Sequence, residues 1–173
     1  MYMKRFALMS MLLLAMVANS FAQRYAIVDT RYILEKIPEY KEANQKLEQT
    51  ADIWQKEIDI KQSELDKMYR ELDAERVMLS PELLKKREDE IFNKEKEVRE
   101  MQRKRFGYEG DYFRKKQELV KPIQDKVYNA IQKMATERMF DFVLDKSEGI
   151  TVIFADPKLD RSDDVLKMLG LKL

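Results

Sequence analysis

Residues that interrupt helices are rare in this chain, and their scarcity constrains the fold more than any other feature. The 173 residues include only four glycines and four prolines. Between residues 30 and 79 the only one of them is Pro38. Because glycine and proline punctuate regular structure, a stretch this poor in them predicts long helices.

The first predicted helix, residues 30–79, has a narrow apolar stripe with heptad spacing. One column contains Ile37, Ala51, Ile58, Leu65, Leu72 and Leu79, with Asn44 as its polar member. The other contains Tyr40, Leu47, Trp54 and Met68 and is interrupted by Lys61. Such a stripe is typical of a coiled-coil seam and is too narrow for the core of a large globular domain.

A second helix is predicted to start at Ser80-Pro81 and to run back along the first. Ser80 is suited to cap a helix whose first residue is Pro81, and Glu82 follows in the first turn. The heptad column of this helix is Leu84, Ile91, Val98, Tyr112 and Leu119, with Arg105 in the remaining slot. The sequence therefore predicts an antiparallel helical hairpin over residues 30–139, about 75 Å long at 1.5 Å per residue.

A turn at Ser80-Pro81 sets which residues of the two helices face each other. Pro38 should lie level with Pro122, and both helices are expected to bend there. Trp54 should lie level with Gly107, with its indole over the bare glycine surface. Gly107 and Gly110 are unfavourable inside a helix and predict a soft point in the second arm.

Strands are predicted only near the two ends of the mature chain. Residues 25–29 form one, and residues 140–156 form a β-hairpin around a loop that ends at Gly149. A short final helix follows, with Ser162 as N-cap and Gly170 as its stop. The expected class is α+β, with a small β body of residues 23–29 and 140–173. Its few strands leave open edges, which oligomerisation would close.

The first 22 residues have the features of a secretory signal peptide. Lys4 and Arg5 precede an apolar run that is too short to span a membrane, and small residues lead to a cleavage site after Ala22. A soluble periplasmic protein is expected.

Composition argues against several functional classes. The chain contains no histidine and no cysteine, which removes the usual general base, thiol nucleophiles and most zinc sites. It has no glycine-rich phosphate loop, and its net charge of +1 does not favour nucleic acid. Neither an enzyme nor a cofactor or metal site is expected. Charged residues make up 38% and mix both signs, as on solvated helix faces.

The segments "YAIVDTRYILEKIPEYKEA", "RFGYEGDYFRKKQELVKPIQDKVYNAIQKMA" and "FDFVLDKSEGITVIFADPKLDRSDDVLKMLG" resemble the Skp/OmpH family of periplasmic chaperones. The resemblance implies a jellyfish-like homotrimer with a shared β-barrel and helical tentacles. It also implies an ATP-independent holdase that encloses unfolded outer-membrane proteins before insertion. The family is associated with lipopolysaccharide as well. Met139 stands where similar proteins often carry a glycine-aromatic pair.

The resemblance and the pattern together nominate several groups of residues. Exposed apolar side chains suited to client contact are Tyr69, Met78, Phe92, Phe106, Tyr108 and Phe113. Met68, Met101 and Tyr112 fit the seam instead. The trimer body would use Ile27, Val28, Phe142, Val143, Val152 and Phe154. Hinges are predicted at Pro38, Pro122, Gly107 and Gly110.

Two weaker hypotheses remain from the sequence. Lys85, Lys86 and Arg87 form a basic cluster that could meet lipopolysaccharide or an anionic membrane surface, although residues 88–90 are acidic and largely cancel it. The alternative function is a non-enzymatic, trimeric coiled-coil scaffold or spacer of the cell envelope. A rigid, closed rod would favour the scaffold, whereas hinges and an open cavity would favour the chaperone.

Overall fold

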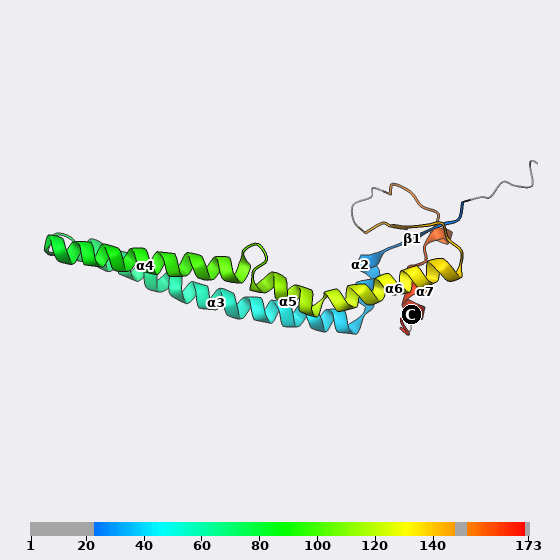
Figure 1. Ribbon diagram of the computed structural model, residues 1–173, viewed down its shortest axis with the longest axis horizontal. Coiled ribbons are helices and arrows are strands. Elements are labelled where there is room, and N and C mark those ends of the chain that lie inside the picture. Colours follow the sequence, from blue (N-terminus) through cyan, green and yellow to red (C-terminus); the bar gives the residue numbers. More distant parts are fainter. Residues whose placement is uncertain (1–22, 148–151, 172–173) are drawn as a thin grey trace, which may run out of the picture. The chain divides into compact units, whose positions relative to one another are not determined.

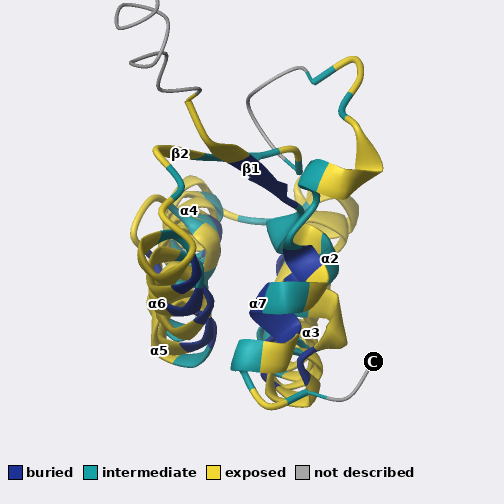
Figure 2. Ribbon diagram, turned by 90° about the vertical axis from the view of Figure 1, so that its right-hand side faces the viewer, coloured by how far each residue is buried: buried dark blue, intermediate teal, exposed yellow. Residues whose placement is uncertain are grey.

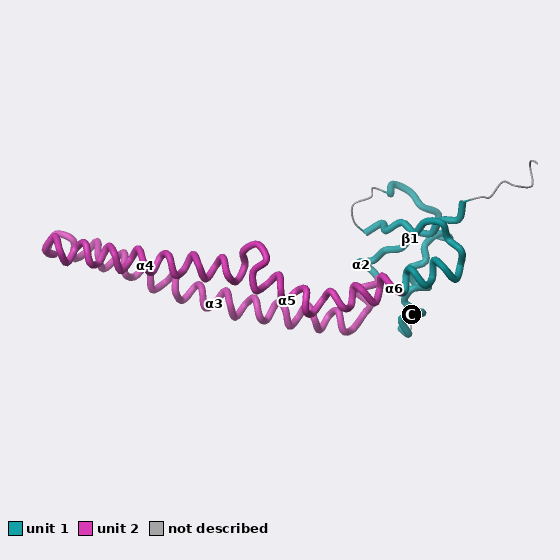
Figure 3. Tube along the Cα trace, in the orientation of Figure 1, with its two compact units in different colours: residues 1–32, 130–173 teal, residues 33–129 magenta. Residues whose placement is uncertain are grey.

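The computed structural model describes residues 23–147 and 152–171 (Figure 1). The predicted signal peptide, residues 1–22, and the predicted loop glycine Gly149 lie outside these ranges. The chain divides into two compact units (Figure 3): the arm, residues 33–129, and the body, residues 1–32 and 130–173. None of the helices in the described ranges combines the length and apolarity that a membrane crossing needs.

The arm is an antiparallel helical hairpin, as the heptad pattern predicts. Helix α3 (Pro38–Glu75) forms one side of the hairpin. Helices α4 (Pro81–Phe106) and α5 (Asp111–Leu119) form the other side and run back along α3. Two further helices cross the unit boundary: α2 (Thr30–Lys36) leads out of the body, and α6 (Lys121–Glu137) leads back. The seam is built from Leu65, Ile91 and Val98, with Met68 and Leu72 packed against them.

At the tip of the arm, the second helix starts where it was predicted, but the first helix ends four residues before the predicted residue 79. Helix α3 ends at Glu75, and α4 begins at Pro81. Ser80 is the N-cap of α4, and its hydroxyl oxygen accepts a hydrogen bond of 3.3 Å from the amide of Leu83. The bond satisfies one of the amides that a helix start leaves without a partner.

The prolines mark helix boundaries, not bends within continuous helices. Ile37 is extended (φ −83°, ψ 117°), so the predicted helix over residues 30–79 is divided into α2 and α3 there. Proline disfavours helical backbone in the residue before it, and it fits the first turn of a new helix. Pro122 likewise occupies the first turn of α6. The predicted second helix is divided at residues 107–110 and again at Val120.

In the body, β1 (Tyr25–Val28) pairs with β2 (Phe142–Asp145) in parallel. The pairing matches Tyr25 with Phe142 and Val28 with Asp145. The amide of Asp141 donates to the carbonyl of Arg24 at 2.7 Å, so the chain enters β2 beside the start of β1. A connection as long as the arm allows this parallel arrangement.

The predicted β-hairpin over residues 140–156 is only half correct. Its first half forms β2, but residues 152–156 form no strand in the described part of the chain. The free edge of β1 instead pairs with a later segment. Ile27 forms a parallel bridge with Asp160, and the amide of Arg161 donates to the carbonyl of Ile27 at 2.8 Å. The residues around Asp160 thus occupy the edge of β1 opposite β2, and the sheet of the described residues has two strands.

The chain ends in η1 (Pro157–Leu159) and α7 (Ser162–Met168), and α7 and β1 carry much of the buried surface of the body (Figure 2). Arg161, not Ser162, is the N-cap of α7, because the Ser162 hydroxyl instead accepts from the amide of Asp29. Gly170 ends α7 with a positive φ of 80°, as predicted. The amide of Leu171 donates to the carbonyl of Leu166, the bond that closes a Schellman motif.

Candidate functional site

The middle of the arm is organised around Trp54 of α3. Its indole meets the ring of Phe106 edge to face, with centroids 6.3 Å apart. The guanidinium of Arg105 lies 4.9 Å from the centre of the Trp54 ring system. These contacts confirm the predicted register of the two helices. The indole contacts the side chains of Arg105 and Phe106, the last two residues of α4 before Gly107.

Arg105 occupies the heptad slot that breaks the apolar column, and ion pairs explain its place there. It contacts Glu57 of α3 at 3.2 Å and Asp111 at the start of α5 at 2.9 Å. Arg114 contacts the same Asp111 carboxylate at 2.5 Å. Hydrogen bonds from Arg114 and then Arg105 hold the pKa of Asp111 below its usual value against the opposing effect of burial.

Residues 107–110, which we call the arm loop, require glycine at both ends. A Cβ atom on Gly107 would lie 2.3 Å from the carbonyl oxygen of Arg103. One on Gly110 would lie 2.9 Å from the carbonyl oxygens of Gly107 and Lys104. Between them, Glu109 has a positive φ of 52°, which is uncommon for a residue with a side chain. The predicted soft point is thus a complete break in the returning helix.

The six predicted client-contact residues are all exposed on the arm. They are Tyr69, Met78, Phe92, Phe106, Tyr108 and Phe113. Tyr69 donates its hydroxyl hydrogen to Glu95, and this bond raises the pKa of its phenol. Phe106 contacts Trp54 and Tyr112 while keeping 40% of its surface exposed. The structure therefore leaves these side chains available, and the arm loop brings Phe106, Tyr108 and Phe113 within one short stretch.

Two ion pairs between α3 and α4 hold the two sides of the arm together between the arm loop and the tip. Lys94 of α4 contacts Glu64 of α3 at 2.6 Å, and Lys61 of α3 contacts Glu97 of α4 at 3.2 Å. The Lys94 hydrogen bond lowers the pKa of Glu64, and the same bond raises the pKa of Lys94. Lys61 thus interrupts the apolar column as an ion-pair partner. Such pairs favour one register of the two helices.

The basic cluster predicted for anionic lipid lies in the first turns of α4, next to the tip. Lys85 and Lys86 are exposed, and neither forms an ion pair within the described ranges. Arg87 pairs with Glu90 at 3.2 Å, which partly neutralises the cluster. The sequence-based interpretation that neighbouring acidic residues weaken this cluster agrees with that contact.

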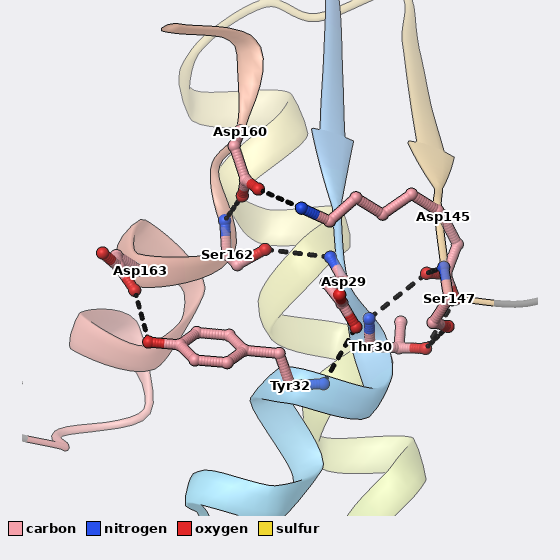
Figure 4. A network of polar contacts seen from close by, with 9 residues as sticks. Asp29, Thr30, Tyr32, Asp145, Ser147, Asp160, Ser162 and Asp163 are labelled. Carbon is pink, nitrogen blue, oxygen red and sulfur yellow. Dashed lines mark hydrogen bonds and ion pairs between the residues drawn. The ribbon is translucent and has the colours of Figure 1, made fainter. Parts of the chain in front are cut away.

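In the body, the last residue of β2 and the residue directly after β1 are both aspartates, and they hold the start of α2 (Figure 4). Asp29 accepts from the amide of Tyr32 at 2.9 Å. Asp145 accepts from the hydroxyl of Thr30 at 2.5 Å and from its amide at 3.2 Å. Burial acts to raise the pKa of Asp145, but the bonds from Thr30 and Ser147 outweigh it and lower the pKa.

A second part of this network surrounds a polar hollow of about 340 Å³. Lys146 contacts Asp160 at 2.8 Å, and the hydroxyl of Tyr32 donates to Asp163 at 3.1 Å (Figure 4). Burial acts to raise the pKa of Asp160, but Lys146 and Ser162 outweigh it and lower the pKa. Within the described ranges, no group of three or more acidic side chains is placed to hold a metal ion. The network is best explained as the joint between β1, α2 and α7.

The six residues predicted for the trimer body differ in their availability. Ile27 and Val28 are buried within their own chain. Val143 and Val152 are half-buried. Phe142 and Phe154 expose 58% and 84% of their surface, and the neighbouring Ile153 exposes 94%. An apolar surface therefore remains on the body.

The roles of Asp29, Asp145, Arg105 and Asp111 were not predicted from the sequence. A signal for the first two was present, because both predicted strands end in aspartate: "AIVD" and "FVLD". Recognising it required the parallel pairing, which puts both aspartates at one edge. For Arg105, the signal was a cation in an apolar heptad column with an aspartate six residues later.

The family model "Outer membrane protein (OmpH-like)" matches residues 24–169. No curated protein matches the chain. A crystal structure of a proposed OmpH-like outer membrane chaperone from Caulobacter crescentus has the same fold, with a TM-score of 0.64. The two proteins are 16% identical, and the match covers 86% of this chain and 84% of the other.

Proposed function

Because this chain belongs to the OmpH-like family of outer membrane proteins, we propose that it is a periplasmic holdase chaperone. It binds unfolded outer-membrane proteins between its helical arms, without ATP, and prevents their aggregation before they reach the membrane. The name of the similar Caulobacter protein, an OmpH-like chaperone, supports the general role. The signal-peptide features of residues 1–22 support export.

One observation carries the proposal: aromatic and methionine side chains are exposed along an arm whose seam is filled by other residues. Leu65, Ile91 and Val98 are buried in the seam, whereas Tyr108, Phe92 and Met78 are not needed there. Large adaptable side chains suit a binder that must hold many apolar segments weakly and then release them. The mixed charges around them keep the arm itself in solution.

We propose that the working form is a homotrimer whose bodies share one β-barrel. The small parallel sheet and the exposed Phe142, Ile153 and Phe154 support this, since a body this small has apolar surface left for another copy. Lipopolysaccharide contact through Lys85, Lys86 and Arg87 is a lesser part of the proposal, because Arg87 is paired with Glu90.

The proposal is tested by diluting a urea-unfolded outer-membrane β-barrel protein into buffer with the mature chain, and recording light scattering. We expect scattering to fall to near the buffer baseline at stoichiometric chaperone, with or without ATP. An inert protein of equal mass is the control. Unchanged scattering would contradict the holdase function and would leave the envelope scaffold as the better account.

A further inference from the structure

The arm loop, residues 107–110, interrupts one side of the arm and leaves the other side continuous. Helix α3 runs without a break from Pro38 to Glu75, and Trp54 and Glu57, which contact Phe106 and Arg105 beside the loop, lie well inside it. The loop therefore interrupts only the returning side of the arm, between α4 and α5, and stands out from these helices in Figure 1. A break that leaves the neighbouring helix intact is better suited to present side chains than to divide the arm.

Three contacts close the base of this loop. Arg105 pairs with Asp111 at 2.9 Å, and the rings of Phe106 and Tyr112 lie 6.1 Å apart. Inside them, the amide of Gly110 donates to the carbonyl of Gly107 at 2.9 Å. Because both stems are held, the loop has little conformational freedom left to lose when it binds a partner.

The loop presents Tyr108, which exposes 96% of its surface. Within the described ranges Tyr108 makes no ring contact and no hydrogen bond. Phe106 and Phe113 are exposed on either side of it. Arg103 and Lys104, in the last turn of α4, form no ion pair within those ranges. The arm loop thus exposes an aromatic side chain, Tyr108, close to the cations Arg103 and Lys104, and the contacts at its base fix its position.

We infer that the arm loop is a built client-contact site, which takes an extended, unfolded polypeptide segment bearing aromatic residues and carboxylates. This inference rests on the proposed chaperone function and assigns part of it to one place. Tyr108 and Phe113 would pack on aromatic side chains of the segment, and Arg103 and Lys104 would pair with its carboxylates. Strands of membrane β-barrels carry aromatic girdles, so unfolded barrels supply such segments.

A polypeptide fits this place better than a lipid surface does. The loop is separated from the tip of the arm by the 26 residues of α4, or about 39 Å at 1.5 Å per residue. A bilayer approached by the tip would not reach it.

The site is located by photocrosslinking. A benzoyl-phenylalanine is placed at position 108 of the mature chain, or as control at position 60, where Ile60 is 61% exposed on α3. The probe is a urea-unfolded outer-membrane β-barrel. We expect a crosslinked product from position 108 several times more abundant than from position 60. Equal yields would overturn the inference. If wild-type chain forms no complex with the probe, the chaperone function itself fails, and the two failures are thereby distinguished.

Affinity is measured in parallel with Tyr108→Ser, Tyr108→Trp and the control Ile60→Ser. Losing one aromatic contact should weaken binding of the unfolded barrel about 3- to 10-fold. Tyr108→Trp should retain the affinity, and Ile60→Ser should change it less than twofold. Unchanged affinity in Tyr108→Ser would overturn the inference. So would a loss confined to binding of phosphatidylglycerol vesicles, which would assign the loop to a lipid surface.

Discussion

Arg105 and Asp111 form an ion pair of 2.9 Å across the base of the arm loop, and it joins the end of α4 to the start of α5. The same arginine reaches Glu57 on α3 and the face of Trp54. Arg105 therefore connects α3, α4 and α5 at the point where the returning side of the arm is interrupted. At this heptad position, where an apolar residue would be expected, the chain instead has a cation with three partners.

The first prediction concerns this pair. Asp111→Asn removes the charge that Arg105 and Arg114 share, so the loop base should open more often. Hydrogen exchange of the amides in residues 106–112 should become faster, while exchange in the seam around Ile91 stays unchanged. The control is Asp125→Asn, which breaks only the exposed pair with Lys121. Unchanged exchange in residues 106–112 would contradict the role of Asp111 as a positioning residue.

The second prediction compares two substitutions inside the loop. Gly107→Ala places a Cβ against the carbonyl oxygen of Arg103, so it should destabilise the arm by about 1–3 kcal/mol. Glu109→Gly relieves a positive φ and should stabilise the arm by up to about 1 kcal/mol. Urea unfolding followed by the fluorescence of Trp54, the only tryptophan, measures both. Equal stability of the two variants would show that the loop backbone adapts freely.

The third prediction concerns acid. The pKa values of Asp145 and Asp160 are lowered in the folded body, so their contribution to stability is complete above the unfolded pKa of about 4. It is lost as the pH falls through the lower, folded values. Hydrogen exchange of residues 25–32, corrected for intrinsic rates, should therefore accelerate below about pH 4.

Asparagine substitutions test that assignment. Asp145→Asn should raise the hydrogen-exchange rate of residues 25–32 at pH 7. In this variant the rate should then increase less on acidification than it does in wild type. Asp156→Asn, at an exposed aspartate that accepts from the amide of Lys158 in η1, is the matched control and should behave as wild type. If the Asp145 variant and wild type share one pH profile, the network does not carry the acid response.

The fourth prediction concerns assembly of the body. The double variant Phe142→Asp, Phe154→Asp places charge on these exposed apolar side chains and should convert the proposed trimer to monomer in sedimentation velocity. Phe92→Asp places the same charge on an equally exposed aromatic of the arm and should leave the trimer intact. A double variant that sediments as a trimer would exclude this surface from the interface.

The arm could be predicted from sequence because its structure is local. The 3.5-residue repeat through Ile58 and Leu65 determines the seam, and Ser80-Pro81 determines the turn and hence the register that Trp54 and Phe106 confirm. The loop at Gly107 was underestimated because propensity gives only the cost of a glycine in a helix. It does not reveal the close approach to the carbonyl of Arg103 that makes glycine necessary.

The body was harder to predict because its contacts join residues more than a hundred positions apart. Alternation identified β1 and β2, but it could not show that they run parallel or that Asp160 takes the other edge of β1. Residues 152–156 alternate as a strand would, yet in the described structure they do not pair with β2, whose outer edge carries no strand there. Ser162 resembled an N-cap, but its hydroxyl serves Asp29 instead.

The central claim is that this chain holds unfolded outer-membrane proteins, and the mass of the complex tests it most directly. The mature chain is mixed with a urea-unfolded outer-membrane β-barrel protein, and the soluble fraction is analysed by native mass spectrometry. The account predicts one dominant species that contains three copies of this chain and one client. A soluble fraction with this chain alone, while all of the client is recovered as aggregate, would contradict it.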